Sequence, residues 1–224
     1  MLSKQVNITV FMHMQYINSR EGMASWTEHT LPPLVIKQLN DKMYEKRKSG
    51  ALEIEKILKD YAAKEDFQSI EQIIVCLGKE FANAPTAQPR NGGLIGLAAC
   101  AIALGKHSSK FTEKLVKPAL ACFTDPDNRV RYFACEALYN ICKVSRGSVL
   151  TFFNEIFDGL SKLADDTDTN VRNGSQLLDV LMKDIVSESG SFNIPSFIPL
   201  LRDRIYTKKP FCRRFVVCWV CGCL

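Results

Sequence analysis

The sequence predicts an all-α protein, a solenoid of about five two-helix repeats of which the last one is truncated. Two observations carry this prediction. Arginines recur along the chain at intervals of 43, 41, 41 and 41 residues, at Arg47, Arg90, Arg131, Arg172 and Arg213. Two apolar helical stripes also recur between them, in the same order and with the same period. A fixed period of this length is the sequence signature of a repeat architecture.

The first helix of each repeat is predicted from apolar or small residues spaced by three and four positions. This stripe occurs at Ile74, Gly78 and Phe81, at Leu115, Ala119 and Cys122, and at Ile156, Leu160 and Leu163. The second helix is predicted from Val130, Ala134, Ala137, Ile141 and Val144, which a shift of 41 places on Val171, Ser175, Leu178, Met182 and Ile185. A period near 41 is typical of a HEAT/armadillo-type repeat. Such arrays are generally binding scaffolds, with one continuous surface and no chemistry of their own.

Three of the recurring arginines follow an aspartate by six residues, in the pairs Asp41/Arg47, Asp125/Arg131 and Asp166/Arg172. The aspartate falls in the predicted turn between two helices, where its side chain can cap the second helix. The arginine fork can then reach a carboxylate or carbonyl group of an adjacent repeat. We therefore predict a structural ladder between repeats that includes Arg90 and Arg213. The aspartate is replaced by Ala84 before Arg90 and by Thr207 before Arg213. The alternative is a stripe of arginines that binds anions.

Three segments are predicted along the chain. Residues 1–30 form an N-terminal extension that we expect to be disordered, and residues 31–219 form the solenoid. Residues 220–224 form a Cys-rich tail of the truncated repeat. The apolar residues near the end of the chain would remain in water if the array stopped there, so a fragment or a short isoform of a longer protein is expected. No apolar run reaches the roughly 18 residues of a membrane span.

The composition favours no enzymatic activity and no cofactor. The three histidines are not accompanied by a carboxylate or thiol at catalytic spacing. Glycines between residues 92 and 105 lack the spacing and the preceding strand of a phosphate loop, and instead predict close helix contact. Most cysteines occupy apolar helical positions, which favours a reducing compartment. A zinc site is the alternative use of the last four, but their spacing favours no metal: Cys212, Cys218, Cys221 and Cys223.

The surface of the predicted helix over residues 129–143 is the candidate partner-binding face. At 100° per residue, four side chains lie opposite its apolar stripe: Tyr132, Glu136, Tyr139 and Lys143. Tyrosine is enriched at the energetic centres of protein interfaces. The alternative is that both tyrosines pack against a neighbouring helix of the array. The net charge of +5 is mild, so we predict no nucleic-acid partner.

Several segments resemble the N-terminal HEAT repeats of the vacuole morphology and inheritance scaffold family. The longest covers residues 125–141, with the sequence DPDNRVRYFACEALYNI, and others cover residues 39–48, 92–100, 157–163 and 196–202. Together they extend over roughly residues 31–219. Members of this family organise the complex of the PIKfyve phosphoinositide kinase.

The resemblance implies a non-catalytic scaffold in the cytoplasm and on the cytosolic face of endosomal and vacuolar membranes. Its partner would be a PIKfyve-type kinase that makes phosphatidylinositol 3,5-bisphosphate, and it would reach the membrane through the complex and not by insertion. The family's C-terminal part supports self-association and binding of a Sac-type phosphatase, so neither is expected of this chain. A different HEAT-repeat adaptor, for nuclear transport or a phosphatase, is the alternative function.

Overall fold

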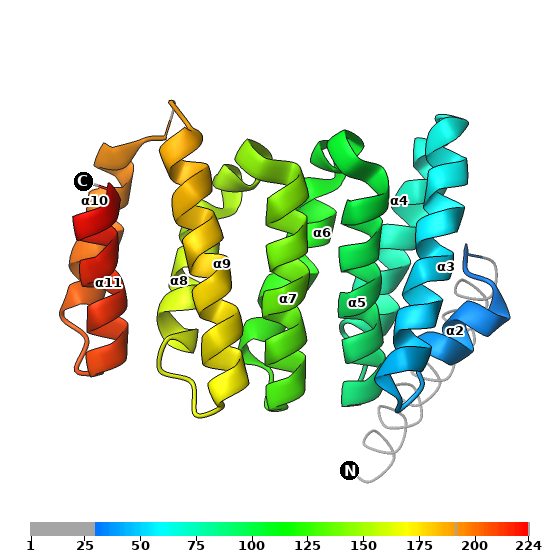
Figure 1. Ribbon diagram of the computed structural model, residues 1–224, viewed down its shortest axis with the longest axis horizontal. Helices are drawn as coiled ribbons and strands as arrows, with labels where there is room; N and C mark the ends of the chain where they lie inside the picture. The colour runs from blue at the N-terminus through cyan, green and yellow to red at the C-terminus, as the bar shows by residue number, and fades with distance from the viewer. Residues whose placement is uncertain (1–29, 191, 224) are drawn as a thin grey trace, which may run out of the picture.

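The computed structural model describes residues 30–190 and 192–223, which form helices and connecting turns and contain no strand. Long helices α3, α5, α7, α9 and α11 stand side by side in one row, with α4, α6, α8 and α10 in a second row behind them (Figure 1). This arrangement confirms the predicted all-α solenoid. The helices are α2 (Pro33–Leu39), α3 (Tyr44–Ala63), α4 (Phe67–Cys76), α5 (Ala87–Leu104), α6 (Thr112–Ala121), α7 (Asn128–Ser145), α8 (Phe153–Leu163), α9 (Thr169–Glu188), α10 (Ile194–Ile205) and α11 (Pro210–Cys223).

Short helical turns complete the connections between the rows. A π-helical turn, Leu77–Phe81, extends α4, and 3₁₀ turns cover Gly105–Phe111, Cys122–Thr124 and Arg146–Phe152. The predicted extension over residues 1–30 lies, except for Thr30, outside the described residues. The boundary predicted between residues 219 and 220 falls inside α11, which continues to Cys223.

Helix starts are specified by side-chain caps, but not by the aspartates that the sequence period indicates. Asp127 and Asp168 cap α7 and α9, since the carboxylate of each accepts hydrogen bonds from the first backbone N–H groups of its helix. Asp125 and Asp166 lie two residues earlier and accept from the N–H groups of Asp127 and Asp168, each over 2.9 Å. These two hydrogen bonds stabilise the turns that precede α7 and α9. The prediction that Asp125 and Asp166 cap the second helix was therefore wrong, because the capping aspartate lies two residues later in each turn.

Helix α5 lies against both α3 and α7, and glycines near its start also bring it close to the end of α2 and to the residue after the π-helical turn. A Cβ atom on Gly92 would lie 2.1 Å from the carbonyl oxygen of Leu39, and one on Gly93 would lie 2.6 Å from the backbone nitrogen of Ala82. Neither backbone atom can move without displacing its helix. The prediction that these small residues permit close helix contact is confirmed.

The C-terminal helices are joined to the array by an aromatic cluster. Trp219 on α11 is fully buried and lies 5.4–5.6 Å, between ring centroids, from Phe153, Phe157 and Phe197. Its indole N–H donates to Oδ1 of Asp179 on α9 over 2.6 Å. The apolar residues near the chain end are thus divided, because Trp219 and Val216 are buried whereas Val217 and Val220 are exposed.

The described cysteines are free thiols, and those on α4 to α7 are buried among apolar side chains. Burial raises the pKa of Cys76 and of Cys135 to about 12, so both remain protonated and unreactive at neutral pH. In the described part of the chain, no helix is both long enough and apolar enough to cross a bilayer.

Candidate partner-binding surface

Two of the recurring arginines bind a carboxylate of the next repeat, at the ends of the helices where the chain turns. Arg90 on α5 places Nε 2.8 Å from Oδ2 of Asp125, and its Nη2 donates to Oδ1 over 3.0 Å. Arg131 on α7 donates from Nε and Nη2 to the two carboxylate oxygens of Asp166 over 2.7 and 2.9 Å. Both pairs are two-point contacts between planar groups, a geometry that lysine cannot reproduce.

The environment of the second pair favours its charged form. Burial would raise the pKa of Asp166, but the hydrogen bond from Arg131, the backbone N–H of Asp168 and the Arg131 charge together hold that pKa below its ordinary value. The same hydrogen bond, which Asp166 accepts, raises the pKa of Arg131. The contact therefore links α7 to the loop before α9 as a stable ion pair at neutral pH.

The other three arginines bind backbone carbonyl groups without a carboxylate partner among the described residues. Arg47 donates to the carbonyl oxygens of Asp41 and Lys42 over 2.8 and 2.9 Å, and Arg172 donates to that of Asp166 over 2.6 Å. Arg213 donates to the carbonyl oxygen of Thr207 over 3.0 Å. All five arginines thus bind the carbonyl group six residues earlier. The link to the next repeat requires the aspartate, which Ala84 and Thr207 replace.

The candidate face on α7 is formed by two exposed charged residues and two half-buried tyrosines. Glu136 and Lys143 are exposed, and neither is in an ion pair with another described residue. Tyr132 and Tyr139 pack partly against the core. The Tyr132 ring meets Phe133 edge to face, with 5.5 Å between centroids, and lies beside Gly174 of α9. The tyrosines therefore contribute both to packing within the array and to its surface.

Partial desolvation also affects this face. The surrounding protein raises the pKa of Glu136 and, together with the Glu136 charge, raises the pKa of Tyr132. No basic side chain of the described residues forms an ion pair with Glu136. A partner that offers a cation can therefore recognise Glu136, while Lys143, seven residues along the same helix, suits an anion.

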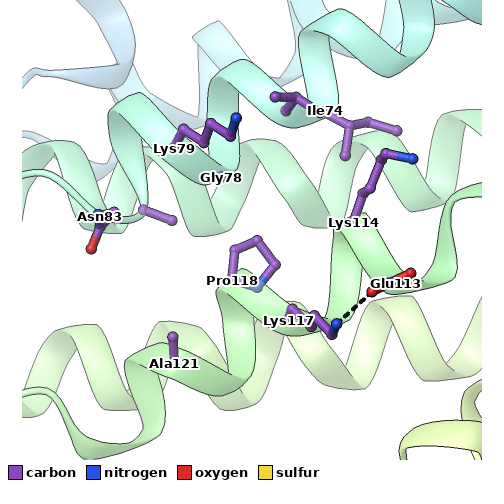
Figure 2. A pocket seen from close by; sticks show the side chains of 11 residues that line it. Ile74, Gly78, Lys79, Asn83, Glu113, Lys114, Lys117, Pro118 and Ala121 are labelled. Atoms are coloured by element: carbon purple, nitrogen blue, oxygen red, sulfur yellow. Dashed lines mark hydrogen bonds and ion pairs between the residues drawn. The ribbon is translucent and has the colours of Figure 1, made fainter. Parts of the chain in front are cut away.

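A groove on the opposite row lies between the end of α4 and α6 (Figure 2). Its apolar floor includes Ile74 and Pro118, and Pro118 lies so close to Gly78 that a Cβ atom there would be 2.8 Å from its ring. The rim carries Lys79, and Lys117 forms an ion pair with Glu113. No set of three or more potential metal ligands occurs among residues 30–190 and 192–223.

A second hollow opens where α3, α7 and α9 begin, and no sequence pattern indicated it. Its walls are Tyr44, Arg47, Asn128, Arg129, Tyr132, Phe133, Asp168 and Asn170. Tyr44 and Phe133 belong to different repeats, yet their rings stack with 6.0 Å between centroids. Tyr44 and Phe133 are 89 residues apart in the sequence, so no local sequence pattern could predict their contact.

The Vacuolar 14 Fab1-binding region matches residues 88–184, which extend from α5 into α9 and include both arginine–aspartate pairs. The Protein VAC14 homolog of Arabidopsis thaliana is 50% identical over 190 residues, which is 85% of this chain. The Vacuole morphology and inheritance protein 14 of Saccharomyces cerevisiae is 40% identical over 227 residues, which is 83% of this chain. The chain belongs to the VAC14 family. It spans about a quarter of the length of these relatives, 26% of each.

Solved structures agree on the fold of this VAC14-family chain. A designed armadillo repeat protein in complex with the peptide (KR)4 is similar over 90% of this chain and 85% of that chain, with a TM-score of 0.50 and 18% identity. A computationally designed armadillo repeat protein for modular peptide recognition is similar over 85% of this chain and 81% of that one, with a TM-score of 0.51 and 13% identity. At such identities the likeness concerns the architecture alone.

Proposed function

We propose that this chain is a non-catalytic scaffold segment that binds a Fab1/PIKfyve-type phosphoinositide kinase through the surface of α7. The observation that carries the proposal is the match of residues 88–184 to a Fab1-binding region, because α7 lies at the centre of that match. In this proposal residues 31–219 act as one solenoid, and the complex supports synthesis of phosphatidylinositol 3,5-bisphosphate on the cytosolic face of endosomal or vacuolar membranes.

The charges on α7 support this assignment. Glu136 and Lys143 have exposed charged groups that form no ion pair with another described residue. The neighbouring Tyr139 adds a partly exposed ring that can be buried on binding without the entropy cost of a flexible side chain. A kinase surface with complementary charges would align along this helix.

The test is capture of a purified Fab1/PIKfyve-type kinase by the immobilised chain. The variant is a charge exchange, Glu136→Lys with Lys143→Glu, which keeps the net charge and alters only exposed groups. The matched control exchanges an ion pair on the other row, Glu113→Lys with Lys117→Glu. We expect the α7 exchange to weaken capture by about ten-fold or more and the α6 exchange to change it by less than about two-fold.

A second variant, Tyr139→Ala combined with Lys143→Glu, tests whether the Tyr139 ring contributes to kinase binding. Because Tyr139 also packs against the core, helicity of this variant must be measured by circular dichroism alongside capture. Unchanged capture by a fully helical double variant, together with unchanged capture by the charge exchange, would remove α7 from the kinase interface. Capture of a nuclear-transport receptor cargo or a protein phosphatase in preference to the lipid kinase would instead favour the alternative adaptor function.

A further inference from the structure

The hollow at the starts of α3, α7 and α9 contains a buried cation that forms no ion pair with residues 30–190 and 192–223. Arg47 is only 6% exposed, yet no carboxylate of the described residues is within ion-pair distance of its guanidinium group. Its Nη1 binds two carbonyl oxygens, but its Nε has no hydrogen-bond partner in the described part of the chain. An unsatisfied buried donor on a charged group costs free energy that a bound acceptor would recover.

The lack of a carboxylate partner for Arg47 has a specific cause in the repeat sequence. Arg131 donates from Nε to Asp166, whereas Nε of Arg90 forms no hydrogen bond but lies 2.8 Å from Oδ2 of Asp125 in an ion pair. In both cases a carboxylate of the following repeat neutralises the guanidinium group. At the corresponding position after Arg47 the chain has Ala84, which provides only its carbonyl oxygen, to Arg90. The first ladder arginine is therefore buried more deeply than its counterparts without the carboxylate that neutralises them.

A second guanidinium group is close to the first. Arg129, at the start of α7, lines the same hollow and is exposed, and its guanidinium group forms no ion pair with another described residue. Burial, and then the charge of Arg129, lower the pKa of Arg47, so the two cations repel each other across the hollow. Bringing two like charges together is unfavourable unless an anion lies between them.

The remaining walls limit what such an anion can be. Asp168 also lines the hollow, but its carboxylate already accepts hydrogen bonds from Asn128, Asn170 and Val171. Two guanidinium groups and one carboxylate leave one net positive charge, which matches a monoanionic carboxylate better than a phosphate group near −2. The rings of Tyr44 and Phe133 form an apolar wall beside Arg47, whose guanidinium carbon lies 5.8 Å from the Phe133 centroid.

We propose that this hollow receives an aspartate or glutamate side chain from a partner polypeptide, with its carboxylate bound between Arg47 and Arg129. The planar guanidinium of Arg47 binds the carboxylate as Arg90 and Arg131 bind theirs, so the partner supplies the carboxylate that Ala84 cannot. The apolar wall contacts the methylene groups of the same side chain. The site rests on the proposed scaffold function only in that the carboxylate belongs to a bound protein.

The experiment is a titration of the ¹⁵N-labelled chain of residues 1–224, followed through the arginine Nε–Hε resonances. The probes are a tetraglutamate peptide, its tetraglutamine counterpart and inorganic phosphate. We expect tetraglutamate to shift the resonances of Arg47 and Arg129, and tetraglutamine to leave both unchanged. Arg129→Gln should weaken tetraglutamate binding by about ten-fold, as expected for loss of one charge-assisted hydrogen bond, and Arg47→Gln should abolish it.

The matched control is Arg214→Gln, which removes the same charge from an exposed position on α11 and should change binding by less than about two-fold. Equal weakening by Arg214→Gln and Arg129→Gln would mean general attraction to a basic chain and would overturn the site. A tetraglutamate titration without a shift at Arg47 would also overturn it. Tighter binding of inorganic phosphate than of tetraglutamate at these two resonances would assign the hollow to phosphate groups instead.

Arg129→Gln keeps the test decisive if Arg47→Gln fails to fold, because Arg129 is exposed and its guanidinium group forms no hydrogen bond or ion pair with another described residue. The titration contains no kinase, so its failure leaves kinase binding through α7 untouched. Conversely, a kinase that binds Arg129→Gln as strongly as the unmodified chain, while tetraglutamate binding is lost, would place the acidic partner residue on a different protein.

Discussion

Arg131 on α7 and Asp166 in the loop before α9 are 35 residues apart and are joined by two hydrogen bonds of 2.7 and 2.9 Å. The side chains are 14% and 8% exposed, so water screens the contact only weakly. The same arginine also donates to the carbonyl oxygen of Asp125, six residues earlier, over 2.8 Å. One guanidinium group thus connects the turn of its own repeat to the turn of the next, which makes neighbouring repeats stack in a defined register.

Removal of the Asp166 charge is the direct test of this connection. We expect Asp166→Asn to lower the free energy of unfolding by about 2–3 kcal/mol, because Arg131 would remain largely buried without its counter-charge. Urea unfolding followed by circular dichroism measures the change. Asp165→Asn is the matched control, since Asp165 pairs only with the exposed Lys209 and should matter by less than about 1 kcal/mol. A loss below about 0.5 kcal/mol for Asp166→Asn would contradict a stabilising role.

The pH dependence of stability follows from the lowered pKa of Asp166. A group whose folded-state pKa lies below its unfolded value binds more protons when unfolded, so its contribution is present above the unfolded value of 3.8 and is lost as pH falls through the folded value. We expect unfolding midpoints in urea to be level from pH 7 to about 5 and to fall below about pH 4. Asp166→Asn should reduce the slope below pH 4, and an unchanged slope would assign the acid sensitivity to other carboxylates.

Gly92 tests how closely α5 approaches the first repeat. Alanine is the better helix former by about 1 kcal/mol, so a helix in open surroundings would gain stability from Gly92→Ala. Here the added Cβ would lie 2.1 Å from a backbone oxygen, and we expect a net loss of about 3 kcal/mol or more. Gly147→Ala is the control because no atom lies within 4 Å of its added Cβ. The thermal midpoint distinguishes them, and equal midpoints would contradict the close contact.

A substitution at Trp219 tests how α11 packs against the rest of the array. Trp219→Phe keeps most of the aromatic packing but removes the indole N–H that donates to Asp179. We expect the free energy of unfolding to decrease by about 1–3 kcal/mol, because Asp179 would lose a hydrogen bond in a buried site. Asp179 would still pair with Lys183, which limits the loss. Val217→Ser, on the exposed side of α11, should have an effect within about 0.5 kcal/mol; a similar loss from both variants would mean that α11 is not specifically docked.

Local periodicity was sufficient to predict the helices. Val130, Ala134 and Ile141 lie on one side of α7 and are fully buried, as their spacing indicates. The role of the turn aspartates was harder to predict, because Asp125 and Asp127 can both serve as a cap and only the backbone path of the turn distinguishes them. The half-burial of Tyr132 was also not decided by its position on the helix, since it depends on how closely Gly174 lets α9 approach.

The sequence by itself determined the class of fold, the repeat period and the family resemblance, because each depends on residues that recur at fixed intervals and act within one helix pair. Only the tertiary structure decided which arginines are paired. Arg47 is more buried than Arg90 and Arg131, yet no carboxylate of the described residues pairs with it, because the adjacent repeat has Ala84 in place of the aspartate. The hollow beside it was likewise decided by the stacking of three helices, which brings Tyr44 next to Phe133 across α5. Contacts between repeats depend on distances that no single repeat encodes.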